Sequence, residues 1–132
     1  MTNHSSEPSC CLFCERATTV IPVAEQGTCI AFPDKYPVTE GHLLIIPKRH
    51  APDYFSLTAE EKKDADALLH RLKDDILQKA PSVTGFNIGI NNGYDAGQTV
   101  FHCHIHLIPR RKGDCENPRG GVRGVIPGKR GY

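Results

Sequence analysis

Residues Val100-Phe-His-Cys-His-Ile-His-Leu-Ile-Pro109 contain histidines at alternate positions 102, 104 and 106, separated by Cys103, Ile105 and Leu107. Successive side chains of a β-strand point to opposite faces, so this alternation predicts a half-buried strand with an apolar face and an imidazole face. A rise of about 3.3 Å per residue places neighbouring imidazoles about 6.6 Å apart, which is the scale of a phosphate group and its contacts. Pro109 lacks an amide donor, so we expect the strand to end just past the histidines.

Three imidazoles in such a row have three interpretations. A surface polar stripe would place three of the seven histidines on consecutive outward positions by chance, which the composition disfavours. A metal site is consistent with His-x-His on a strand, because this spacing offers two nitrogens to zinc. The third interpretation is catalysis, in which one imidazole attacks and its neighbours orient it or bind the leaving oxygens.

The residues just before the histidines form the stretch Asn91-Asn-Gly-Tyr-Asp-Ala-Gly-Gln-Thr99. Gly93 and Gly97 allow a tight loop that exposes backbone, and Gln98 and Thr99 add neutral hydrogen-bond donors. Such a loop suits an anion better than a metal. Taken alone, it is more typical of an ordinary hairpin loop with Asn-Gly turn chemistry.

Together these residues resemble a known protein family. Gly97-Gln-Thr-Val-Phe-His-Cys-His-Ile-His-Leu107 is similar to the signature of the histidine triad nucleotide hydrolases and transferases. Leu107-Ile-Pro-Arg-Arg-Lys-Gly-Asp114 resembles the extension found in the diadenosine-polyphosphate hydrolase branch. Upstream, Phe32-Pro-Asp-Lys-Tyr-Pro-Val-Thr-Glu-Gly-His-Leu-Leu-Ile-Ile-Pro-Lys-Arg-His50 resembles the nucleoside-binding half. The resemblance covers about residues 10–115.

Composition agrees with one small intracellular domain. The 132 residues include 16 basic and 15 acidic side chains, a balance that does not indicate a protein coating nucleic acid. No apolar run reaches the roughly 18 residues of a membrane span, and the N-terminus lacks a signal-peptide core. We therefore expect a cytoplasmic protein with no nucleic-acid or membrane partner. The six cysteines are expected to be reduced, since Cys29 and Cys103 fall in apolar strands.

The chain divides into a flexible tail at residues 1–9, a domain at residues 10–115 and a basic, extended C-terminal arm at residues 116–132. Strands are predicted at residues 27–32 and 41–46, and by the alternation of Phe86, Ile88 and Ile90. A capping box of Thr58 and Glu61 opens a helix to about Lys79. Its apolar stripe contains Ala65, Leu68, Leu69, Leu72, Ile76 and Leu77. These elements predict an α+β fold with an antiparallel sheet and one long helix, as the resemblance also implies.

The resemblance implies a role for each matching residue. His104 matches the nucleophile that attacks the α-phosphate and forms a nucleotidyl-histidine intermediate, which water then cleaves. His106 and His42 match histidines that contact the phosphate oxygens or the leaving group, and Asn91 matches the asparagine of the site loop. The remaining nucleotide contacts fall on Gly97, Gln98 and Thr99 for the phosphate, Asp34 for the ribose hydroxyls and Phe32 for the base pocket, although Phe32 is almost equally typical of a core residue.

Cys11 and Cys14 have the spacing of a zinc-binding turn, which we expect as a tight turn at residues 10–15. Family members with such a pair complete a structural zinc site with two histidines, and the matching positions here are His50 and His102. The alternative is a redox or merely buried cysteine pair. Cys10, next to Cys11, leaves open which thiolates bind.

The C-terminal arm carries an excess of basic residues. Between Arg110 and Tyr132 there are seven Lys and Arg against two acidic residues. The arm is either a solvated tail or a segment reaching a polyphosphate, and we favour the second. The resemblance then implies a hydrolase of dinucleoside polyphosphates that releases a nucleoside monophosphate and forms a homodimer. An adenosine phosphoramidase and a non-enzymatic zinc-stabilised nucleotide-binding module are the alternatives.

Overall fold

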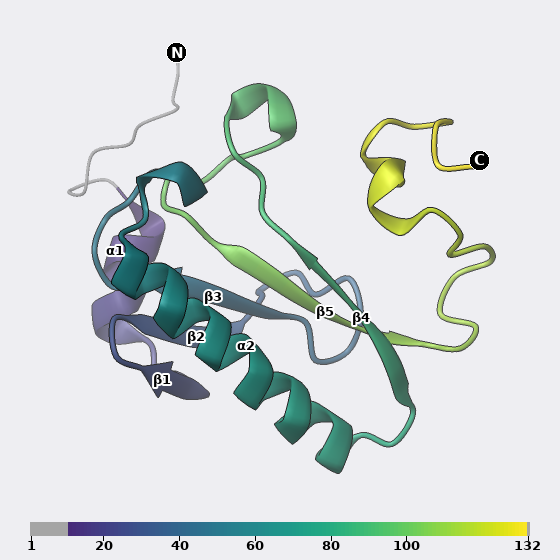
Figure 1. Ribbon diagram of the computed structural model, residues 1–132, viewed down its shortest axis with the longest axis horizontal. Coiled ribbons are helices and arrows are strands. Elements are labelled where there is room, and N and C mark those ends of the chain that lie inside the picture. The colour runs from purple at the N-terminus through teal and green to yellow at the C-terminus, as the bar shows by residue number, and fades with distance from the viewer. Residues whose placement is uncertain (1–10, 132) are drawn as a thin grey trace.

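A computed structural model describes residues 11–131, so the predicted tail at residues 1–9 and Cys10 lie outside the described residues (Figure 1). The helices are α1 (Leu12–Thr19) and α2 (Ala59–Lys79). The strands are β1 (Ala24–Gln26), β2 (Cys29–Pro33), β3 (Leu43–Pro47), β4 (Val83–Gly89) and β5 (Ile105–Arg111). Short 3₁₀ turns occupy Tyr54–Ser56, Tyr94–Ala96 and Gly121–Val125. No helix within residues 11–131 has the length and apolar character that crossing a bilayer requires.

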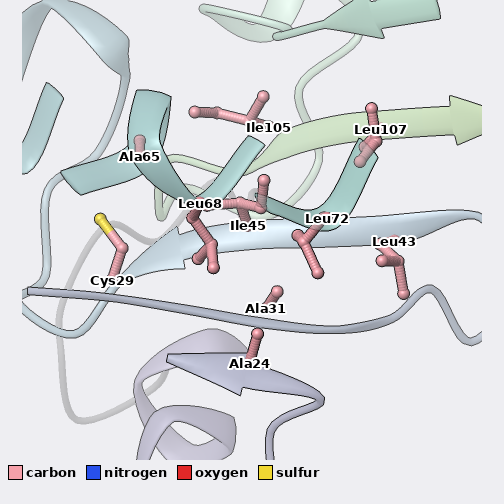
Figure 2. Close-up of a cluster of buried hydrophobic side chains, with 10 residues drawn as sticks. All are labelled: Ala24, Cys29, Ala31, Leu43, Ile45, Ala65, Leu68, Leu72, Ile105 and Leu107. Carbon is pink, nitrogen blue, oxygen red and sulfur yellow. The ribbon is translucent and has the colours of Figure 1, made fainter. Parts of the chain in front are cut away.

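All neighbouring strands pair antiparallel, in the order β1-β2-β3-β5-β4, which confirms the predicted α+β fold. The long helix α2 lies across one face of this sheet (Figure 1). Its buried stripe, Ala65, Leu68 and Leu72, packs against inward side chains of the strands (Figure 2). The helix begins as predicted, because the Thr58 side chain accepts from the Glu61 amide and Glu61 accepts from the Thr58 amide. Leu77, placed on the predicted stripe, is exposed instead.

Two separate segments pack against the opposite face of the sheet. Helix α1 packs over β2 and β3 through an apolar cluster that includes Phe13, Phe32 and Leu44. The C-terminal segment around Gly121–Val125 contacts β4. His106 and Ile108 of β5 lie on this same face of the sheet, between helix α1 and the C-terminal segment. Leu44 of β3 is the register partner of His106, and side chains of paired residues point to the same face.

The structure corrects the predicted histidine strand. Strand β5 begins only at Ile105, so of the three alternating histidines only His106 stands in it. His102 and His104 precede the strand, where the Cys103 amide donates to the carbonyl of Ala51 instead of to a strand neighbour. Nor does Pro109 end β5, which continues to Arg111. Strand β3 pairs only as far as Leu107, and a proline is tolerated where one side of a strand is unpaired.

Two further expectations were wrong. Residues 12–19 form the helix α1 and not a tight turn, with the Cys11 thiol capping its N-terminus by accepting from the Cys14 amide. The C-terminal arm is not wholly extended, because Gly121–Val125 forms a 3₁₀ turn. The short edge strand β1 was also missed, since three residues carry too little alternation to predict a strand.

Candidate active site and metal centre

His104 is buried and its ring is held in a single neutral form. Its Nδ1–H donates to the carbonyl of His102 at 2.9 Å, which leaves Nε2 with a free lone pair. The side chain is 8% exposed, and this burial lowers its pKa. The Phe13 ring meets the imidazole edge to face, with 5.0 Å between the ring centroids. An uncharged imidazole with one fixed nitrogen and one free nitrogen is what a nucleophile requires.

His42 and His106 form a hydrogen-bonded pair whose proton positions follow from the backbone. The Val38 amide donates to His42 Nδ1 at 3.1 Å, so neutral His42 carries its proton on Nε2. That proton is donated to His106 Nδ1 at 2.9 Å, and neutral His106 therefore carries its own proton on Nε2. Burial, with His104 and His42 nearby, lowers the pKa of His106 to about 4. His106 thus presents a hydrogen-bond donor at neutral pH.

Asp34 stands beside this pair. Its Oδ2 lies 3.4 Å from His42 Nε2 and 3.8 Å from His106 Nδ1, while its Oδ1 accepts from the Tyr36 amide. These three side chains could in principle hold a metal ion. A metal needs a lone pair on His42 Nε2, however, and the Val38 amide assigns that position a proton. The pair therefore suits proton donation better than metal binding.

A cleft of about 290 Å³ opens beside His104. The residues predicted to bind nucleotide that line it come from β2, β5 and the loops around β5: Phe32, Asp34, Asn91, Gly97, Thr99, His104 and His106. Phe32 is both a core residue and part of the cleft wall, so its two interpretations are not exclusive. His42 is not among the lining residues of this cleft and contacts it through His106 and Asp34, both of which line it.

Gln98 has a different place from the one predicted. Its side chain is 1% exposed and does not line the cleft. The Oε1 atom accepts from the Gly93 amide, and Nε2 donates to the carbonyls of Pro52 and Val100. All three contacts tie the loop before the histidines to itself and to the chain after His50. The side chain of Gln98 therefore holds the shape of the loop.

Helix α1 supplies cleft residues that the sequence alone did not indicate. Leu12, Phe13 and Arg16 line the cleft from the side opposite the loop. The Arg16 guanidinium lies over the Phe32 ring, 5.8 Å from its centroid. The only signal in the sequence was the apolar Leu12-Phe13 pair between two cysteines, and interpreting those residues as a turn concealed it.

The four predicted metal ligands come together at the start of α1. One ligand atom each from Cys11, Cys14, His50 and His102 lies within 4.8 Å of the other three. His50 Nδ1 is 3.2 Å from the Cys14 sulfur, and His102 Nδ1 is 3.4 Å from it. His102 Nε2 donates to the Pro47 carbonyl at 2.7 Å, which leaves Nδ1 as the free ligand nitrogen. Two thiols and two imidazoles in this arrangement fit tetrahedral zinc.

Burial and the Cys11 thiol raise the pKa of Cys14 to about 11. Without a cation this thiol stays protonated at neutral pH, so metal binding has to release its proton. His102 faces the thiols, whereas His104 and His106 face the cleft. Neighbouring histidines of one short segment thus face two different groups of side chains.

Comparisons with known proteins agree with this arrangement. A family model described as HIT domain matches residues 16–113. An uncharacterized 16.1 kDa HIT-like protein of Mycoplasma pneumoniae is 39% identical over 83% of this chain and 79% of that protein. The asymmetrical bis(5'-nucleosyl)-tetraphosphatase of Schizosaccharomyces pombe is 42% identical over 64% of this chain and 46% of that protein. A Zn-bound histidine triad family protein from Mycobacterium smegmatis has a TM-score of 0.73 and 34% identity, covering 82% of this chain and 80% of that one.

Proposed function

The chain belongs to the histidine triad (HIT) family of nucleotide hydrolases, and from that premise we propose that it cleaves nucleoside 5'-phosphate derivatives at the α-phosphate through His104. The observation that supports the proposal most is the hydrogen bond that His104 Nδ1–H donates to the His102 carbonyl. This hydrogen bond leaves Nε2 free at the edge of the cleft. Adjacent donors at His106 and Thr99 suit a phosphate that gains charge during transfer.

The reaction has two halves. His104 Nε2 attacks the α-phosphorus while the bond from phosphorus to the leaving oxygen or nitrogen breaks. The Nε2–H of neutral His106 donates a hydrogen bond to the leaving atom, which takes its proton from solvent. A water molecule then attacks the phosphorus of the nucleotidyl-histidine, and the phosphorus–nitrogen bond to His104 breaks. The attacking water releases its proton to solvent, His104 returns to the neutral imidazole, and a nucleoside monophosphate leaves. His42 and the Val38 amide keep His106 in the form that donates.

The nucleoside half of the substrate is proposed to lie in the cleft between α1 and β2. Phe32, Phe13 and the Arg16 guanidinium provide an apolar and cationic wall for a base. Asp34 keeps Oδ2 as an acceptor for ribose hydroxyls, because the Tyr36 amide occupies Oδ1. Asn91, Gly97 and Thr99 line the same cleft, and we propose that they contact the phosphate.

Two classes of leaving group compete. A dinucleoside polyphosphate substrate is supported by the relative named as a tetraphosphatase and by the segment after the histidines. A nucleoside phosphoramidate requires the same nucleophile and differs only in the leaving atom. In a third reading, a zinc-stabilised nucleotide-binding module, His104 would never become covalently loaded.

A structural zinc ion held by Cys11, Cys14, His50 and His102 is also part of the proposal. It is supported by the convergence of the four ligand atoms and by the Zn-bound relative. When bound, zinc would supply a cross-link between the start of α1, the end of β3 and the chain before β5. That cross-link would place α1, and with it Phe13 and Arg16, against the cleft.

The decisive experiment follows covalent loading of His104. Protein mixed with an adenosine 5'-phosphoramidate or diadenosine tetraphosphate and quenched in alkali should carry adenylate on His104, identified by mass spectrometry. His104→Asn should retain nucleotide binding and lose turnover by several orders of magnitude. His70→Asn, on the exposed side of α2, is the matched control and should turn over normally. Nucleotide binding by the wild type without any loading or turnover would instead support the binding module.

A further inference from the structure

A second hollow, of about 610 Å³, adjoins the nucleoside cleft. It lies between the β4–β5 part of the sheet and the C-terminal segment around Gly121–Val125. Asn91 and His106 line both spaces, so the two meet at the pair of residues nearest the proposed phosphate position. His104 lines only the nucleoside cleft. The hollow is therefore continuous with the site and reached past His106.

The direction of the reaction assigns this hollow to the leaving group. In-line displacement places the attacking and leaving atoms on opposite sides of the phosphorus. His104 attacks from the side of the nucleoside cleft, and His106, whose Nε2–H donates a hydrogen bond to the leaving atom, stands at the mouth of the hollow. A leaving group that departs away from His104 and toward the His106 Nε2–H enters this space.

The lining of the hollow is mainly apolar. Its floor and walls include Ile88, Ile90, Ile108, Val122 and Val125. Val122 and Val125 are 64% and 73% exposed, so their side chains stand uncovered along one wall. The segment Gly121–Val125 contributes Gly121, Val122 and Val125 to the lining, and not its basic residue Arg123.

The cationic side chain in this lining, Arg110, is already paired with the carboxylate of Asp114. Arg110 donates through Nε and Nη2 to the two carboxylate oxygens of Asp114, both at 2.7 Å, and through Nη1 to Asn87 at 2.7 Å. A polyphosphate chain entering the hollow would have to break this bidentate pair or remain without a counter-charge. An uncharged chain would leave the pair intact and bury apolar surface against the valines and isoleucines.

We infer that the hollow is the leaving-group subsite and that it selects an apolar, uncharged leaving group, with Val122 and Val125 as its specificity-determining wall. This inference rests on the proposed function. It favours a phosphoramidate of an apolar amine over a dinucleoside polyphosphate. In this inference the C-terminal arm contributes to the site through its apolar residues, where the sequence favoured contact of its basic residues with a polyphosphate.

Two matched substrates separate the possibilities: adenosine 5'-phosphoramidates of hexylamine and of 6-aminohexanoate. Both release a primary alkylamine and differ only in a distal carboxylate. We expect the wild type to cleave the hexylamine compound with at least tenfold higher kcat/KM. Val122→Asp and Val125→Asp should each reduce that ratio severalfold. Ile126→Asp, in the same segment but not lining the hollow, is the matched control and should preserve it.

The outcomes distinguish this inference from the proposed function. Equal kcat/KM for the two compounds, or a ratio that the valine variants leave unchanged, would overturn the inference while leaving the nucleophile assignment standing. Loss of loading and of turnover for every adenylate substrate would overturn the proposed function. Binding to the inactive His104→Asn protein provides a second readout, because equal affinity for the two compounds overturns the inference without any reference to turnover.

Discussion

The hydrogen bond that His106 Nε2–H offers to the leaving atom predicts that the cost of losing it varies with the leaving group. His106→Asn should reduce kcat strongly for an alkyl phosphoramidate, because the poor leaving nitrogen gains negative charge as its bond to phosphorus breaks and the His106 donor stabilises that charge. The same change should cost much less with adenosine 5'-(p-nitrophenyl phosphate), whose phenolate is stable without protonation. Steady-state kinetics on both substrates measures the difference. An equal loss on the two would show that His106 positions the phosphate and does not stabilise the leaving atom.

Buried histidines also predict how stability depends on pH. Burial lowers the pKa of His42, His104 and His106, and that of His106 falls to about 4. An unfolded chain binds these protons near pH 6.5. Between pH 6.5 and 4 the unfolded state therefore holds more protons than the folded state, and the free energy of unfolding decreases as the pH falls. Urea unfolding across this range measures the slope, which His106→Asn should make shallower. A slope of zero would contradict the burial of these imidazoles.

At this scale the placement of the site residues was largely predictable, because the family resemblance indicated the residues and the alternate spacing located the histidines. The residues expected at the phosphate and ribose, such as His104, His106, Asn91 and Asp34, meet at one cleft. What spacing could not show was which contacts are internal. Gln98 has a side chain that could donate to a ligand, yet its amide group is hydrogen-bonded to Gly93, Pro52 and Val100. Those partners depend on the tertiary structure.

Among the elements, α1 is the one whose position depends most on the proposed metal. The helix has eight residues, too few to be stable alone, and its first turn contains Cys14 beside its thiol cap Cys11. Cys11→Ser with Cys14→Ser should abolish zinc binding, lower Tm, and weaken nucleotide binding, because Phe13 and Arg16 reach the cleft from α1.

The exposed Cys115 provides the matched control for this experiment. Cys115→Ser should retain about one zinc per chain by metal analysis and should melt like the wild type. If the double variant keeps the Tm and zinc content of the wild type, the cluster is an ordinary group of buried thiols and imidazoles.

Elements with a strong periodic signal were predicted well, and those defined by their neighbours were not. Helix α2 begins at its capping box because Thr58 and Glu61 satisfy each other locally. The start of β5 is determined by tertiary contacts. His102 and Cys103 donate to the carbonyls of Pro47 and Ala51, and strand pairing begins only at Ile105. Alternation alone cannot distinguish a β-strand from an extended segment whose hydrogen-bond partners lie outside the sheet.

At the scale of the whole molecule, the sheet has two edges of different character. Strand β1 is three residues long, whereas β4 has seven and ends the sheet on the other side. Beside β4, an apolar groove between the strand and α2 is lined by Leu69, Phe86, Ile88 and Leu107. A long edge strand with adjoining apolar surface favours pairing with another chain. We therefore retain the homodimer as a prediction, with β4 and α2 as its surface.

Ile88 and Val23 make a matched pair for this prediction, because each is 52% exposed and they lie at opposite edges of the sheet. A lysine at an interface centre buries an unpaired charge, so Ile88→Lys should shift the protein to the single-chain mass at micromolar concentration. Val23→Lys should leave the dimer intact, since it changes the β1 edge by the same chemistry. Light scattering coupled to size exclusion measures both masses. A wild type that elutes with the mass of one chain would rule out the homodimer, and dissociation by Val23→Lys alone would move the interface to β1.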